Sequence, residues 1–293
     1  RMQTNNFKHY LHLHFLVFIA GFTAILGELI TISSIPLVWH RMLIASVLTF
    51  IYLIIKKNNI KIDLKTLLKF SLPGLIIALH WITFFEAIEQ SNISITLAMF
   101  STAAFFTSFI EPFFFKRKII FYEIIMGLLV IIGVYMITMA EISYLNGIIL
   151  GILSALFSSL FSVFNGKLVK KYSPIIISFY EFLTGLIFIT IYLIMFNSFD
   201  SVFLNSLISL DYLYLFILGS ICTAYAFIAA VGLMKFLSPF TVVLTYNLEP
   251  VYGIILALIL FPDKENMSTM FYLGASLILI TIIINSVFKN KYS

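Results

Sequence analysis

The sequence predicts an all-α membrane protein, with ten transmembrane helices arranged as two inverted five-helix repeats. Three observations predict this fold class. Hydrophobic residues make up 61% of the chain and charged residues 11%, and the mean hydropathy of +1.09 is too high for a domain that folds around a core in water. The apolar residues form long runs, and short basic clusters lie between those runs.

Ten apolar runs approach the length of about 20 residues that an α-helix needs to cross a hydrocarbon layer about 30 Å thick. They span residues 12–32, 36–55, 70–90, 92–114, 119–140, 147–167, 174–196, 212–234, 239–261 and 269–288. The first run has no small-residue cleavage site behind a short apolar core, so we expect a retained helix and not a signal peptide. Arg1, which precedes Met2, has no explanation in the sequence.

The basic residues predict the side of the membrane that each loop faces. With the amino terminus in the cytoplasm, the cytoplasmic segments of a ten-helix chain hold sixteen of the eighteen Lys and Arg residues. They are Arg1, Lys8, Lys56, Lys57, Lys61, Lys65, Lys69, Lys116, Arg117, Lys118, Lys167, Lys170, Lys171, Lys235, Lys289 and Lys291. Because short cytoplasmic loops are rich in Lys and Arg, we expect both termini in the cytoplasm and the protein in the cell (inner) membrane.

Weak internal similarity divides the chain into two halves. The segment TFIYLI at 49–54 recurs as TIYLI at 190–194, and the residues Ser91, Leu97, Phe114 and Gly127 recur as identical types 147 positions later. We therefore expect one repeat over residues 1–140 and a second over 141–293. Since each half holds an odd number of helices, the second is inserted upside down, and a central site lies near the membrane midplane.

Several classes of function find no support in the sequence. The net charge of +5 comes from short clusters beside apolar runs, a pattern typical of orientation signals and not of a nucleic-acid-binding face. The single cysteine, Cys222, excludes a disulfide framework and a cysteine-based metal site. His12 and His14 project from different faces of a helix, and no phosphate loop or catalytic triad is present. We expect no metal, no cofactor and no enzyme activity.

Glu249 is the first candidate for a functional residue, because it lies near the middle of the apolar run 239–261. A carboxylate at that depth costs about 3 kcal/mol or more unless it faces protein or water. Pro250 follows it and cannot donate to the carbonyl oxygen of Tyr246, which loosens the helix. We expect Glu249 and Tyr246 to face a central cavity, the alternative being a structural carboxylate bonded to a neighbouring helix.

Four further residues are expected near the same site, at mid-depth on other helices: His80, Trp81, Tyr225 and Tyr180. A histidine that faces a carboxylate could hold or relay a proton, although many buried histidines are hydrogen-bonded core residues. The aromatic candidates compete with a large background, since the chain holds 32 Phe and 15 Tyr, and most such rings pack helices or face lipid.

Two pairs of opposite charge lie inside the apolar runs, Glu28 with Arg41 and Lys167 with Glu181. Their spacing is similar and the order of charge is reversed between the two halves. We interpret them as structural ion pairs that offset the cost of burying charge. The alternatives are a pair of gates that close opposite sides of the carrier, or extension of the Lys167 side chain to the cytoplasmic surface.

The order of several short motifs resembles that of the EamA-type drug/metabolite transporters. These motifs are WHRM at 39–42, WITFFEAI at 81–88, Ser238-Pro239, LEPVY at 248–252, FPDK at 261–264 and Gly274, and the resemblance spans about residues 12–288. It implies ten helices in inverted repeats, with a central cavity formed mainly by the first four helices of each half. It also implies movement of small metabolites, often amino acids and frequently outward.

We therefore expect a secondary transporter that exports small organic metabolites such as amino acids, by alternating access around a midplane site. Its partners would be a small-molecule substrate and the lipid bilayer, with proton or ion coupling and no nucleic acid. Glu249 suits an ammonium-bearing substrate and equally suits proton coupling. The alternatives are an integral-membrane enzyme, or a membrane scaffold or receptor without transport. The oligomeric state is not determined by the sequence.

Overall fold

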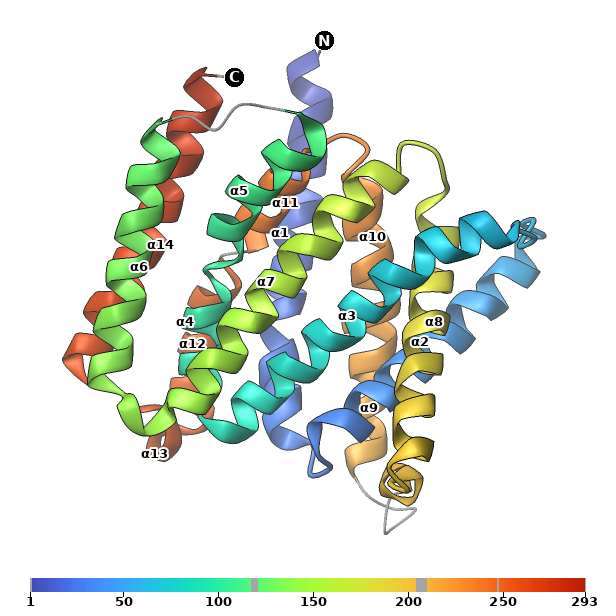
Figure 1. Ribbon diagram of the computed structural model, residues 1–293, viewed down its shortest axis with the longest axis horizontal. Helices are drawn as coiled ribbons and strands as arrows, with labels where there is room; N and C mark the ends of the chain where they lie inside the picture. Colours follow the sequence, from blue (N-terminus) through green and yellow to red (C-terminus); the bar gives the residue numbers. More distant parts are fainter. Residues whose placement is uncertain (1, 117–120, 204–209, 247, 293) are drawn as a thin grey trace.

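The computed structural model describes residues 2–116, 121–203, 210–246 and 248–292, and every regular element in these ranges is a helix (Figure 1). The elements are α1 (Met2–Leu29), α2 (Ser34–Ile55), α3 (Leu64–Gln90), α4 (Ile93–Phe100), α5 (Ala103–Phe115), α6 (Phe121–Ala140), η1 (Ile142–Tyr144), α7 (Leu145–Leu168), α8 (Pro174–Met195), η2 (Phe199–Val202), α9 (Leu210–Gly219), η3 (Ser220–Tyr225), α10 (Ala226–Leu233), α11 (Pro239–Tyr246), α12 (Glu249–Leu260), α13 (Pro262–Glu265) and α14 (Thr269–Tyr292). The elements η1 and η2 are 3₁₀ turns, and η3 is π-helical.

Eight helical segments within the described ranges are long and apolar enough to cross a membrane, and two shorter apolar helices accompany them. The ten segments overlap the ten predicted apolar runs. The shorter pair are Ile124–Ala140 in α6 and Thr269–Ile284 in α14, counted over the described side chains alone. The all-helical fold with many spans is therefore confirmed, whereas ten spans in two repeats divided near residue 140 remain a prediction.

Two of the apolar segments are broken near mid-length. Ser101 and Thr102 separate α4 from α5, and their hydroxyl groups donate to the carbonyl oxygens of Ala98 at 2.6 Å and Met99 at 2.7 Å. The second break separates α11 from α12 and places Glu249 and Pro250 in the first turn of α12. The starts of α5 and α12 lie within one residue of the 147-residue offset found in the sequence.

The helices pack as one bundle with a separate pair at its edge. α6 and α14 lie side by side at the left of Figure 1. A side chain at Gly274 would place its Cβ 2.9 Å from the carbonyl oxygen of Gly133, so glycine allows these two backbones to approach. In the rest of the bundle α3 runs beside α7 and crosses α8 (Figure 1).

Both ends of the chain lie at the same edge of the bundle, and α13 lies at the opposite edge (Figure 1). This arrangement fits the predicted orientation, which stays a prediction. Of the basic residues behind it, Arg1, Arg117 and Lys118 lie outside the described residues, as do the side chains of Lys289 and Lys291.

The orientation can be tested at exposed loop positions. In a Cys222→Ser background, a cysteine at Asn58 should react with an impermeant thiol reagent only from the cytoplasmic side. A cysteine at Ser201 or Asn266 should react only from outside, because the first loop holds no Lys or Arg and the second holds only Lys264. Labelling of Asn58→Cys in intact cells would contradict the predicted topology.

Candidate functional site

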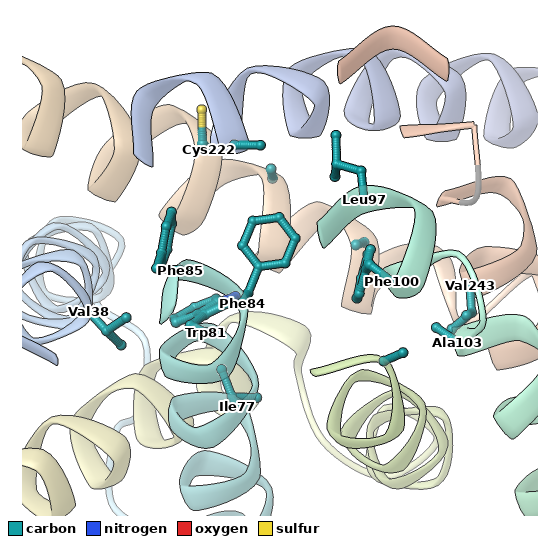
Figure 2. Close-up of a cluster of buried hydrophobic side chains, with 14 of the residues drawn as sticks. Val38, Ile77, Trp81, Phe84, Phe85, Leu97, Phe100, Ala103, Cys222 and Val243 are labelled. Carbon is teal, nitrogen blue, oxygen red and sulfur yellow. The ribbon is translucent and has the colours of Figure 1, made fainter. Parts of the chain in front are cut away.

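A cavity of about 110 Å³ lies inside the bundle, between the broken helices and their neighbours. Its wall is mostly aromatic and small, and Figure 2 shows Phe84 of α3 between Trp81 of the same helix and Phe100 of α4. The rings of Phe84 and Phe100 meet edge to face, with centroids 5.5 Å apart. Besides Trp81 and Cys222, the polar or ionisable side chains of the wall are Thr23, Arg41, His80, Ser158, Ser162, Tyr246 and Glu249.

Glu249 lies in this cavity, as the sequence analysis expected of it. Its side chain is 5% exposed and projects from the first turn of α12, beyond the break that ends α11 at Tyr246. Tyr246 lines the same cavity. The first turn of a helix presents unpaired backbone N–H groups and a partial positive charge, which favours a carboxylate there.

Arg41 is the cation of the cavity and is 4% exposed. Its Nε donates to Thr223 Oγ1 at 2.5 Å, its Nη2 donates to the Cys222 carbonyl oxygen at 3.5 Å, and its guanidinium carbon lies 4.0 Å from the centre of the Trp81 ring. Among the described residues, Nη1 has no hydrogen-bond partner, and no nitrogen–oxygen distance of 4.0 Å or less joins Arg41 to Glu249. The two opposite charges therefore share the cavity without neutralising each other directly.

The predicted ion pair between Glu28 and Arg41 is wrong. Glu28 Oε1 instead accepts from Lys264 Nζ at 2.5 Å, and this hydrogen bond raises the pKa of Lys264. The reason is where the helices end: α1 stops at Leu29 and α2 begins at Ser34, so Glu28 reaches the end of the bundle while Arg41 lies two turns inside. Because Lys264 is 69% exposed, this ion pair adds little stability, about 1 kcal/mol at most.

The predicted pair between Lys167 and Glu181 is also wrong. Glu181 Oε2 accepts from Asn165 Nδ2 at 3.2 Å, and Lys167 Nζ lies 5.1 Å from the ring centre of Phe114. Asn165 and Lys167 are two residues apart and so point to different faces of α7. The face toward α8 carries the amide and not the cation.

His80 and Trp81 both line the cavity. The His80 ring stacks on Phe100 with centroids 5.4 Å apart, and its Nδ1 lies 2.9 Å from Ser154 Oγ and 3.0 Å from the Ser154 carbonyl oxygen. These contacts fix the ring orientation. His80 is thus a hydrogen-bonded core residue and a cavity residue at once.

Tyr225 and Tyr180 do not line the cavity, which corrects their predicted position. Tyr225 is 46% exposed, and its hydroxyl lies 3.0 Å from His12 Nε2. The π-helical turn η3 inserts extra residues per turn, which rotates Tyr225 away from the face that sequence spacing predicts. The Tyr180 hydroxyl donates to the carbonyl oxygen of Ile60 at 2.5 Å, at the loop between α2 and α3.

Several lining residues were not among the predicted ones. On α7, Ser158 and Ser162 face the cavity one turn apart, with Phe161 beside them. Serines at 154, 158 and 162 repeat every four residues within an apolar run, which is the spacing of one helix face. This spacing of serines could have identified Ser158 and Ser162 as candidate cavity residues. Phe227 carried no such signal, because its orientation depends on the preceding η3.

The fold and the cavity together define a polytopic helical membrane protein with an internal cavity. The sequence profile of the EamA-like transporter family matches residues 9–139 and again residues 145–287, and the chain belongs to this family. No curated protein matches the chain. It is similar to a solved structure titled "Crystal structure of protein", with 14% identity, coverage of 96% of this chain and 98% of that one, and a TM-score of 0.67. At this identity the similarity shows the fold alone.

Proposed function

We propose that the protein is a secondary transporter that exports small organic metabolites, with zwitterionic amino acids as the substrate class. The observation that carries this proposal is the pair of unlike charges, Glu249 and Arg41, in one buried aromatic cavity without a direct ion pair. Membership in a family of transporters supports the class of function.

The charges of the cavity favour a substrate that carries both signs. A buried charge is costly unless it is paired, and the cavity wall holds one carboxylate and one guanidinium. A ligand with an ammonium group and a carboxylate adds no net charge and offers a partner to each. The rings of Phe161 and Phe227 in the wall add faces that attract an ammonium group. The volume of about 110 Å³ suits a small ligand.

The transport mechanism in this proposal is alternating access around the cavity. The breaks at Ser101–Thr102 and before Glu249 put irregular backbone at the depth of the cavity, as in carriers whose discontinuous helices hold the substrate. Rocking of residues 1–140 against residues 141–293 would then expose the cavity to one side at a time. Export through the cell membrane, driven by a proton or ion, completes the proposal.

Flux in sealed vesicles tests this proposal against an integral-membrane enzyme and against a scaffold or receptor. Purified protein in vesicles should move labelled neutral amino acids down their gradient, and protein-free vesicles should not. Absence of flux for amino acids, amines and other small zwitterions alike would contradict the proposal.

Cys222 provides a second readout, because the only cysteine of the chain lines the cavity. A small thiol reagent should inhibit flux, and a transported amino acid should slow the modification of Cys222 at least severalfold by occupying the same space. The control is a cysteine at Asn58 in the Cys222→Ser background, where the substrate should give no protection. Equal labelling rates of Cys222 with and without a transported substrate would place its binding site elsewhere.

A further inference from the structure

A second buried carboxyl group lies outside the cavity. Glu181 is on α8, which packs mainly against α3 and α2, and its side chain is 0% exposed. The cavity wall does not include it. Its hydrogen-bond partner is Asn165 on α7, also fully buried, whose Nδ2 donates to Oε2 at 3.2 Å.

Glu181 and Asn165 together have one more hydrogen-bond acceptor than the donors near them can satisfy. Glu181 Oε1 and Asn165 Oδ1 are both buried without a partner among the described residues, and so is the hydroxyl of Ser178 one turn earlier on α8. An ionised carboxylate and an amide oxygen only accept hydrogen bonds, whereas a hydroxyl donates once. Two acceptors against at most one donor leave a buried oxygen unpaired, which is costly and rare in folded proteins.

The elements packed against Glu181 bring no cation to it. Besides Glu181, the titratable side chains of α2, α3, α7 and α8 are His40, Arg41, Tyr52, Lys65, Lys69, His80, Glu86, Glu89, Lys167, Tyr180 and Tyr192, while α10 contributes none and Asp200 of η2 lies past the far end of α8. None of these groups forms a described hydrogen bond or ion pair with Glu181. His40 lies against the Val202 carbonyl oxygen, Arg41 donates to Thr223, His80 lies against Ser154, and the Tyr180 hydroxyl donates to Ile60. An ionised Glu181 would thus be an uncompensated buried charge.

We propose that Glu181 and Asn165 form a proton-binding site separate from the substrate cavity. One proton taken up from water resides on Glu181 Oε1, so that Oε1–H donates to Asn165 Oδ1 while Asn165 Nδ2 donates to Oε2. The neutral acid and the amide then satisfy each other at both ends, and no other bond forms or breaks. Separation of α7 from α8 would expose the carboxyl group to water and release the proton. This site goes beyond the proposed substrate binding at Glu249.

The variant Glu181→Gln tests the proposal, because a glutamine donates and accepts at the two positions used by the protonated acid. Wild-type and variant protein should unfold reversibly in mixed detergent micelles, with the variant the more stable at pH 8. Above the ordinary pKa of glutamate, the unfolded wild-type chain has lost the proton that the native protein still holds. The unfolding equilibrium constant of the wild type, divided by that of the variant, should therefore rise by about tenfold per pH unit in this range.

Infrared spectroscopy of the native protein provides an independent measurement. The difference spectrum of wild type minus Glu181→Gln should contain the carbonyl band of a protonated carboxyl group at neutral pH. The control is Glu86→Gln on α3, since the Glu86 carboxylate already accepts from Ser34 Oγ at 2.5 Å and Gln90 Nε2 at 2.8 Å. This control should remove no such band.

Three outcomes would overturn the proposal: parallel stability profiles of wild type and Glu181→Gln, a difference spectrum without an acid band, or failure of the glutamine variant to fold. None of these measurements requires a substrate. The result is therefore independent of whether the amino-acid flux is observed.

Discussion

Replacing Glu249 with glutamine is expected to leave folded protein in the membrane and to abolish transport or nearly so. The amide keeps the shape of the carboxyl group but can neither hold a charge nor release a proton. Loss of a buried, charge-assisted contact to an ammonium group costs about 1.5–3 kcal/mol, equivalent to about 10- to 100-fold in affinity. Substrate binding and flux in vesicles measure the two effects separately.

The two uses of Glu249 lead to different results. If it binds the ammonium group of the substrate, binding itself is lost in Glu249→Gln. If it carries the coupling proton, binding and exchange persist while accumulation driven by a gradient fails. Glu28→Gln is the matched control, since that carboxylate bonds the exposed Lys264 at the end of the bundle and should transport nearly normally. Full flux in Glu249→Gln across a range of pH would show that Glu249 has only a structural role in packing the helices.

Replacing Gly74 with alanine is expected to destabilise the bundle strongly. A Cβ at this position would lie 2.6 Å from the carbonyl oxygen of Glu181 and 3.1 Å from its Cα. These are backbone atoms of α8, so no side-chain rotation relieves the clash, and α3 must move away from α8. Forcing an extra carbon into a packed interior costs about 1–3 kcal/mol. A lower melting temperature and a lower yield of folded protein in detergent should follow.

Gly232→Ala is the control for this prediction. The nearest atom that its Cβ would meet outside its own helix is 3.7 Å away, in the side chain of Pro174, which is an ordinary contact. Alanine also favours a helix over glycine by up to about 1 kcal/mol. The control should melt at or above the wild-type temperature. Equal melting temperatures for the two variants would show that α3 and α8 do not approach at Gly74 as described.

The sequence by itself determined that this is a helical membrane protein of many spans. The length of an apolar run and the spacing of basic clusters are local properties of the sequence. A long apolar run forms a helix in a bilayer, because its backbone polar groups must be paired within the segment. The burial of Glu249 followed in the same way from its depth in the run 239–261. Pro250 marked the interruption, and the structure has a break between α11 and α12 there.

Only the tertiary structure decided which charges and rings meet. The ends of α1 and α2 lie a few residues from where hydropathy puts them, and this separates Glu28 from Arg41. The π-helical turn η3 brings Thr223 to Arg41 and turns Tyr225 outward. Hydropathy is insensitive to both features, because either one leaves an apolar run apolar. A shifted helix end changes the depth at which a side chain lies, and an inserted residue rotates each later side chain by about 100°. Partners across helices depend on that rotation and on which helices become neighbours.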